Sequence, residues 1–139
     1  QLPLLAAMSL LGAFLLLSLH TARSKSVTFD EVAHLPAGYT HLVWGDFRLN
    51  PEQPPLVKEL AAAPLALSAV DTPSRESRTW IDAPLVITNH WEFGRQFLFE
   101  VNRRQVDRLV FLGRIPMVAN SVMSRFTSRL LGVIAIHCC

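Results

Sequence analysis

The sequence has few cysteines, no cluster of basic residues and none of the catalytic motifs of soluble hydrolases. Its two cysteines, Cys138 and Cys139, are adjacent at the end of the chain, where a mutual disulfide would be strained and would close no useful loop. They indicate no redox compartment. A G-x-S-x-G motif and a catalytic-cysteine motif are both absent, which argues against a soluble hydrolase.

Charged residues are also scarce, at 17% of the 139 residues, and the two signs are mixed. The 13 basic residues are scattered among 11 acidic ones, all of which lie between Asp30 and Asp107. Only the end of the chain, with Arg114, Arg125 and Arg129, has no acidic residue nearby in the sequence. A nucleic-acid-binding surface needs basic residues clustered on one face or stripe. We therefore expect no nucleic-acid partner.

Apolar residues are abundant, at 50%, and they concentrate at the front of the chain. The run from Leu2 to Leu19 contains no charge and is long enough, at about 18 residues, to cross most of a hydrocarbon core roughly 30 Å thick. It predicts a transmembrane helix, or an uncleaved signal anchor, over residues 1–19. The alternative is a secretory signal peptide, whose apolar region spans about 7 to 15 residues after a basic start. The run here is longer and shows no basic start, although the chain begins at Gln1 rather than Met.

Residues 20–108 are expected to form a loop that carries two or three short interfacial helices. Thr28 followed by Glu31 matches a capping box, which predicts a helix toward Trp44 that Pro36 and Gly38 weaken and bend. Turn-forming residues fill 45–55. The Leu- and Ala-rich stretch 56–70, divided by a proline, either lies along the bilayer surface or packs in a helical core.

The rest of the loop contains an exposed excursion at 71–84 and a further helical pattern over 91–106. Residues 109–118 are apolar apart from Arg114, with Gly113 and Pro116 breaking their regularity, and they predict the start of a second membrane helix. The segment that follows is too polar to complete it, because arginine at mid-membrane costs about 2.5 to 3.5 kcal/mol. We therefore expect an all-α membrane protein with a partial second transmembrane segment and an atypical tail over 109–139.

Asp30 and Glu31 are the first candidates for chemistry. As neighbours on a helix they point about 100° apart, so one could act on a substrate while the other supports it. A carboxylate there could be the general base for an acceptor hydroxyl. Alternatively, both acids simply stabilise a helix N-terminus, by about 0.3 to 1 kcal/mol each.

A metal site and a phosphate site are the next candidates. Asp30, His34 and His41 would share one stripe of an ideal helix and could hold a divalent metal, although interfacial or hydrogen-bonded histidines are the simpler interpretation. The double-proline turn beside Lys58 leads into a helix N-terminus, which favours anions. It could therefore face a phosphate, or be a stiff loop with solvated charges. Arg48 lies in the same region.

Four segments of the loop, in this order, resemble the N-terminal part of phospholipid-carrier-dependent glycosyltransferases: T-F-D-E-V-A-H-L-P-A-G-Y, W-G-D-F-R-L-N-P-E-Q-P-P-L-V-K, F-G-R-Q-F-L-F-E and D-R-L-V-F-L-G-R-I-P. These enzymes include the protein O-mannosyltransferases and aminoarabinose transferases of the GT-C class. The resemblance covers Val27 to about Val118. It implies a multi-pass helical membrane enzyme that moves a sugar from a polyprenyl-phosphate carrier to an acceptor, with the loop on the non-cytoplasmic side.

The resemblance also implies roles for single residues. The acidic motif of the family's first loop falls on Asp30, as the catalytic base, and on Glu31, as its supporting neighbour. A His or Lys that meets the carrier phosphate commonly precedes the prolines of the next turn, whereas this chain has Gln53. Arg48 and Lys58 are the candidate substitutes for that cation. Some relatives bind a metal near the preceding acid, which makes Glu52 the metal candidate.

Two features depart from the family. Such enzymes have many more membrane helices, so we expect this chain to be a truncated N-terminal fragment that is inactive alone, and its partners to be the lipid-linked sugar and membrane lipid. Arg23 and Lys25 after the first helix would favour a cytoplasmic loop by the positive-inside rule, while the resemblance places the loop outside. The alternative function is a non-catalytic, membrane-anchored interaction module whose loop binds a partner or a lipid head group.

Overall fold

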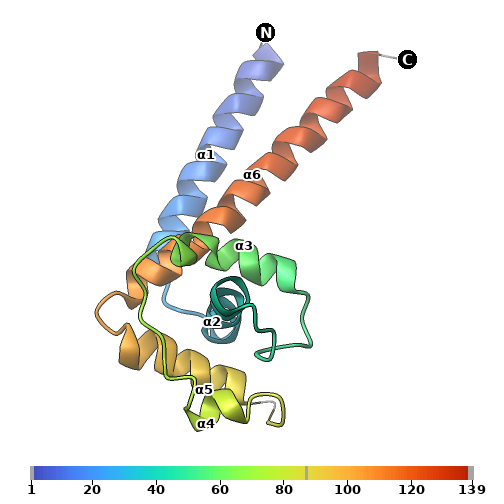
Figure 1. Ribbon diagram of the computed structural model, residues 1–139. Coiled ribbons are helices and arrows are strands. Elements are labelled where there is room, and N and C mark those ends of the chain that lie inside the picture. Colours follow the sequence, from blue (N-terminus) through green and yellow to red (C-terminus); the bar gives the residue numbers. More distant parts are fainter. Residues whose placement is uncertain (1, 87, 138–139) are drawn as a thin grey trace. The chain divides into compact units, whose positions relative to one another are not determined.

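The computed structural model describes the backbone of residues 2–86 and 88–137, with side chains for 5–86 and 88–127. Cys138 and Cys139 lie outside these ranges. The described backbone contains helices and no strand, which confirms the all-α prediction (Figure 1). The elements are α1 (Leu2–Ser24), α2 (Phe29–Trp44), α3 (Pro55–Ala66), α4 (Arg78–Ile81), α5 (Asn89–Arg95), the π-helical η1 (Gln96–Val101) and α6 (Val106–His137).

The chain divides into two compact units, which are described separately. The first unit comprises Gln1–Lys25 and Ile115–Cys139, and the second comprises Ser26–Arg114. In the first unit, α1 continues to Ser24, past the end of the apolar run, and almost none of its stretch Leu5–Ser24 is buried. Among the described residues it is the one helix that is long and apolar enough to cross a membrane.

The final helix, α6, runs without interruption through Gly113 and Pro116. The expected break at these residues is therefore wrong. A proline removes one hydrogen bond from the helical ladder and can kink it, but the bonds on either side allow the helix to continue. In the first unit, the guanidinium of Arg125 lies 4.4 Å from the ring centroid of Phe14.

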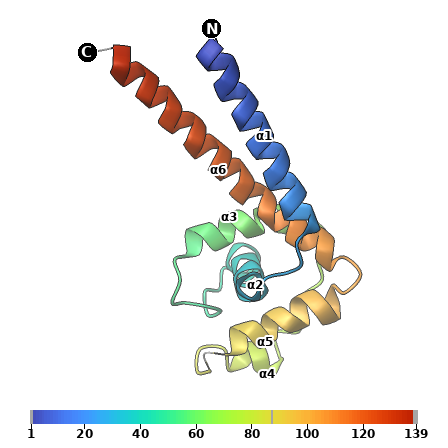
Figure 2. The same cartoon turned by 180° about the vertical axis from the view of Figure 1, so that it is seen from behind.

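Helix α2 is the centre of the second unit and lies between α3 and α5 in both views (Figures 1 and 2). Its predicted capping box is confirmed: the Thr28 N–H donates to Glu31 Oε2 at 2.8 Å. The helix ends at Gly45, whose φ of +63° is in the left-handed region that glycine adopts without strain. The predicted helix toward Trp44 is confirmed, with Pro36 inside it, and the segment Leu35–His41 is buried between its neighbours.

Two glycines allow the neighbouring helices to approach α2 at backbone distance. A Cβ on Gly94 of α5 would overlap the carbonyl oxygen of Val32, and a Cβ on Gly38 would overlap the carbonyl oxygen of Lys58 in α3. Val32 lies four residues before Pro36, which has no N–H to donate to its carbonyl. The Cα–H of Gly94 points at this oxygen instead, in the manner of a weak C–H···O contact.

Aromatic side chains from the later helices complete the core of the second unit. Phe93 and Phe97 are fully buried, and Trp80 packs edge-on against Trp44 with 4.6 Å between ring centroids. The segment 71–84 is therefore not wholly an exposed excursion, since α4 places Trp80 in the core. The helix expected over 91–106 ends at Val101, because the side-chain amide of Asn102 donates to the Phe97 carbonyl at 2.9 Å and stops the ladder.

Candidate functional site

The acidic pair lies in the first turn of α2, and its two members have different surroundings. Both carboxylate oxygens of Glu31 accept hydrogen bonds from Arg114: Nε to Oε1 at 2.6 Å and Nη2 to Oε2 at 2.7 Å. The Thr28 N–H adds a third bond. The side chains of Glu31 and Arg114 are only 26% and 14% exposed. Glu31 therefore joins the start of α2 to α6 within the second unit.

These contacts keep Glu31 ionised. Partial burial raises the pKa of Glu31, but the hydrogen bonds from Arg114 and Thr28 outweigh it and hold the pKa below the ordinary 4.5. A carboxylate that is stabilised in this way is a poor proton acceptor. The pair also shows that Arg114, which has no acid near it in the sequence, has one 83 residues away in the chain.

Asp30 is exposed, and its carboxylate makes no hydrogen bond or ion pair within the described part of the chain. Its position in the first turn of α2 places it near the positive end of the helix dipole. Of the two acids, Asp30 is therefore the one whose oxygens are available to an external hydroxyl group.

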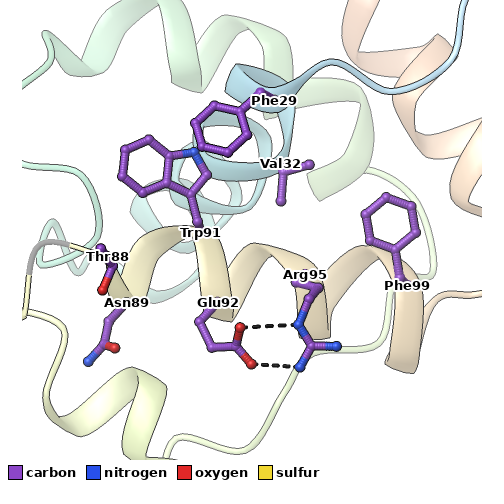
Figure 3. A pocket seen from close by; sticks show the side chains of 8 residues that line it. All are labelled: Phe29, Val32, Thr88, Asn89, Trp91, Glu92, Arg95 and Phe99. Atoms are coloured by element: carbon purple, nitrogen blue, oxygen red, sulfur yellow. Dashed lines mark hydrogen bonds and ion pairs between the residues drawn. The ribbon is translucent and has the colours of Figure 1, made fainter.

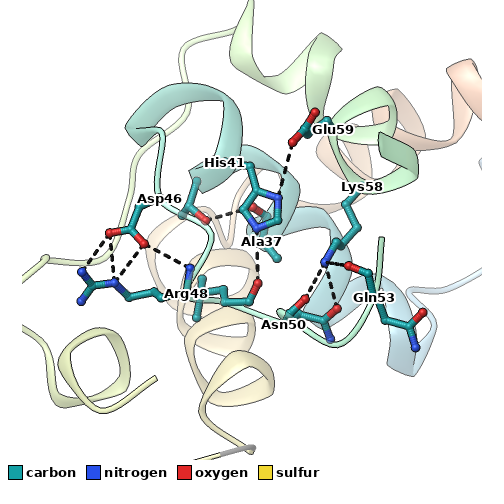
Figure 4. A network of polar contacts seen from close by, with 10 residues as sticks. Ala37, His41, Asp46, Arg48, Asn50, Gln53, Lys58 and Glu59 are labelled. Atoms are coloured by element: carbon teal, nitrogen blue, oxygen red, sulfur yellow. Dashed lines mark hydrogen bonds and ion pairs between the residues drawn. The ribbon is translucent and has the colours of Figure 1, made fainter. Parts of the chain in front are cut away.

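The turn before α3 is held by Lys58, which folds back under it (Figure 4). Its Nζ donates to the backbone oxygen of Asn50 at 2.6 Å, to Asn50 Oδ1 at 3.1 Å and to the backbone oxygen of Gln53 at 2.9 Å. Burial lowers the pKa of Lys58, although Glu52 and Glu59 oppose the shift. Since all three N–H groups are used, phosphate binding by Lys58 remains a prediction that would require these bonds to break.

The other residues assigned to phosphate or metal lie around this turn. Arg48 donates through Nε to both oxygens of Asp46 at 3.0 Å, and its guanidinium lies 4.7 Å from the Trp80 ring centroid (Figure 4). Gln53 and Glu52 are exposed, and the amide of Gln53 extends away from Lys58 in Figure 4. Lys58 thus contacts the backbone oxygen of Gln53, not its side chain. Arg48 forms an ion pair with Asp46.

Asn50 is the residue on which this turn depends most. It is buried and has a φ of +53°, in the left-handed region that costs most residues energy but that asparagine tolerates. We expect Asn50→Ala to lower the free energy of unfolding by about 2 kcal/mol, from backbone strain and the lost Lys58 hydrogen bond. Urea denaturation of this variant and of the parent chain measures the loss. Asn50→Gly, which removes the bond without the strain, should lose about 1 kcal/mol, and equal losses would contradict the role of φ.

The proposed metal stripe on α2 is not assembled. His41 is buried, with Nε2 at 3.3 Å from the Leu49 carbonyl oxygen and Nδ1 at 3.8 Å from Glu59 Oε1. Within residues 5–86 and 88–127, whose side chains the structure describes, no three His, Cys, Asp or Glu side chains lie close enough to hold a metal ion. The stripe of Asp30, His34 and His41 therefore does not fit a bound divalent metal, and metal binding by Glu52 stays a prediction.

The buried histidines predict a loss of stability in mild acid. Burial lowers the pKa of His41 below 6.5, with a smaller lowering by Lys58, while the Leu49 carbonyl, Glu59 and Asp46 oppose the shift. Since the unfolded chain then binds the proton more tightly, stability is fully present above about pH 6.5 and falls as the pH decreases toward the folded pKa.

Denaturation midpoints measured from pH 7.5 to pH 5 should therefore decrease steadily. His41→Gln, which cannot gain a proton, should reduce the slope. A midpoint that does not change over this range would contradict neutral burial of the histidine.

Three nitrogen atoms near the start of α2 lack hydrogen-bond partners among the described residues: His34 Nδ1, His90 Nε2 and Trp91 Nε1. His90 is buried, and its ring centroid lies 3.9 Å from that of Trp91. Burial lowers the pKa of His90. His34 and Lys58 lower it further, while Glu52 opposes the shift. Sequence patterns did not identify His90 as a site residue, because it belongs to α5, far along the chain from α2.

A cavity of about 590 Å³ opens beside the start of α2 (Figure 3). Phe29 stacks on Trp91 at one side, with 4.9 Å between ring centroids, and Phe99 lies at the other side. Arg95 forms two hydrogen bonds with the Glu92 carboxylate in this region, at 2.6 and 3.1 Å. The lining residues are Phe29, Val32, Thr88, Asn89, Trp91, Glu92, Arg95 and Phe99.

Comparisons of the chain with protein-family models, curated proteins and solved structures found no match. The interpretation of the site therefore depends on its geometry. It combines an unpaired carboxylate on a helix N-terminus, a second carboxylate fixed by arginine, and a rigid proline turn held by a buried lysine.

Proposed function

We propose that the chain is the N-terminal part of a membrane glycosyltransferase that moves a sugar from a polyprenyl-phosphate carrier to an acceptor. The observation that carries this proposal is the difference between the two acids. Asp30 is exposed and unpaired among the described residues, while Glu31 is fixed by Arg114 and Thr28. A catalytic base needs this combination of a free carboxylate and a rigid support.

In the proposed reaction, Asp30 accepts the proton of the acceptor hydroxyl as its oxygen bonds to the anomeric carbon of the sugar. The bond between that carbon and the carrier phosphate breaks, and the polyprenyl phosphate leaves as an anion. The base thereby makes the hydroxyl a better nucleophile at the moment of transfer. Glu31 acts only by positioning α2.

The proposal includes a membrane arrangement in which Ser26–Arg114 is a non-cytoplasmic loop with interfacial helices between α1 and a second membrane segment. One contact supports it: Arg114 Nη2 donates to the Ser26 carbonyl oxygen at 2.8 Å. The chain thus enters and leaves this unit at nearly the same point, as a loop between two neighbouring membrane helices must.

The test uses a chimera in which the whole chain replaces the corresponding N-terminal segment of an active lipid-carrier-dependent sugar transferase. Loss of the base should reduce sugar transfer by about 100-fold or more in Asp30→Asn, because general-base catalysis contributes about 10² to 10⁴. Transfer from a labelled polyprenyl-phosphate sugar is measured at equal amounts of folded protein. Asp46→Asn, which removes a carboxylate that is paired with Arg48, is the matched control.

An unchanged rate in Asp30→Asn would overturn the catalytic assignment. The second candidate function, a membrane-anchored interaction module, is favoured by the cavity in Figure 3, where Phe29 is 70% exposed. A chimera that is inactive with the parent chain, together with saturable binding of a partner that Phe29→Ala abolishes, would support the module instead.

A further inference from the structure

Helix α3 has an unusual distribution of side chains. Its inner stripe consists of Lys58, Ala62 and Leu65, spaced four and three residues apart, and all three are buried against the rest of the unit. The backbone of α3 also approaches Gly38 of α2 too closely for a Cβ to fit. Because this stripe faces the rest of the unit, the opposite side of α3 faces outward.

Both charged residues of α3 are turned toward the protein. Lys58 is 4% exposed and binds the preceding turn, while Glu59 faces the imidazole of His41 at 3.8 Å. Helices on an aqueous surface normally direct such residues outward. In α3 they are used internally, and none remains for the outer face.

The outer face of α3 is apolar throughout. Leu56, Val57 and Leu60 are 64%, 58% and 45% exposed, and Leu67, directly after the helix, is 91% exposed. Residues 60–70 contain no charged side chain at all. An exposed helix face that carries only apolar side chains is normally covered by protein or by lipid rather than by water.

The short connection to α1 favours lipid over protein as the cover of this face. α1, the candidate membrane span, ends at Ser24, and the second unit begins at Ser26, so the unit is held within a few residues of the bilayer surface. With 12 residues, α3 is roughly 18 Å long and too short to cross a core of about 30 Å. A helix of this length and composition can bind a bilayer by lying in the plane of its interface.

We propose that the outer face of α3, defined by Leu56, Val57, Leu60 and Leu67, inserts into the acyl region of the lipid bilayer. The charged residues are used inside the unit, so this face meets lipid without burying a charge. The proposal concerns membrane docking only. It rests on the membrane arrangement of the proposed function and not on the chemistry of Asp30. An unchanged transfer rate in Asp30→Asn would refute the catalytic base alone, whereas the fluorescence test below addresses the docking of α3 alone.

The test attaches an environment-sensitive NBD fluorophore to single cysteines in the whole chain, with Cys138→Ser and Cys139→Ser as background. Leu60→Cys and Leu67→Cys report on the outer face of α3, and Glu76→Cys is the control at an exposed loop position. Each variant is reconstituted in phosphatidylcholine vesicles that carry nitroxide groups at a shallow or a deep acyl position. Circular dichroism confirms that the helix content is unchanged.

We expect blue-shifted emission at positions 60 and 67. Shallow nitroxides should quench it about twice as strongly as deep ones, because an in-plane helix buries its face roughly 5–10 Å deep. Position 76 should be quenched by aqueous iodide instead. Iodide quenching at 60 and 67 would overturn the proposal. Protection there from both iodide and nitroxide would also overturn it, since protein would then cover the face.

Discussion

Replacing Gly94 by alanine is expected to lower the free energy of unfolding of the second unit by about 3 kcal/mol or more. The added methyl group would overlap the carbonyl oxygen of Val32, a backbone atom that cannot rotate away. α5 must then move off α2 and lose the packing of Phe93 and Phe97. The measurement is urea denaturation followed by tryptophan fluorescence, since all three tryptophans lie in the second unit.

The matched variants separate close approach from any general effect of the substitution. Gly38→Ala should be similarly destabilising, because its Cβ would overlap the Lys58 carbonyl oxygen. Gly12→Ala makes the same change in α1, where nothing lies within 4 Å, and should leave the denaturation midpoint unchanged. A Gly94→Ala protein as stable as the parent would show that α2 and α5 do not pack at backbone distance.

The second large effect is expected at the ion pair between Glu31 and Arg114. Glu31→Gln should lower the free energy of unfolding by about 2 kcal/mol, because it weakens two charge-assisted hydrogen bonds and leaves the guanidinium half-paired. Arg114→Met should cost a similar amount, since it leaves the carboxylate with Thr28 as its single donor.

A double-mutant cycle isolates the interaction itself. Because the two side chains are in direct contact, the losses should not add, and we expect a coupling energy of about 1 to 2 kcal/mol. The loss in Glu31→Gln should also disappear in acid: with a lowered pKa, the carboxylate contributes stability above about pH 4.5 that is lost as the pH falls below it. Fully additive losses would contradict the pairing.

Local patterns in the sequence predicted the local structure well. The Thr28 and Glu31 capping box is an interaction over three residues, and both its position and its hydrogen bond are confirmed. The apolar run likewise predicted α1, because length and composition alone determine whether a helix can cross a bilayer. The proline rule failed at Pro116, where the helix continues on both sides of the proline.

The tertiary partners could not be predicted from spacing. Glu31 was expected to support Asp30, but nothing local indicated Arg114, 83 residues away. Lys58 was assigned to phosphate because it lies beside the double-proline turn, where the resemblance implies a cation. In the structure the backbone oxygens of Asn50 and Gln53 accept hydrogen bonds from it instead. Whether a charged side chain faces solvent or binds another part of the protein depends on its burial. Burial in turn depends on contacts between elements far apart in the chain.

The division of roles between the two acids is tested most directly by comparing Asp30→Asn with Glu31→Gln in the same denaturation experiment. Asp30→Asn should change the free energy of unfolding by less than about 1 kcal/mol, because only a helix-dipole interaction is affected. Glu31→Gln should lower it by about 2 kcal/mol. Equal losses in the two variants, or a larger loss in Asp30→Asn, would contradict the assignment of Asp30 as the free acid and Glu31 as its structural support.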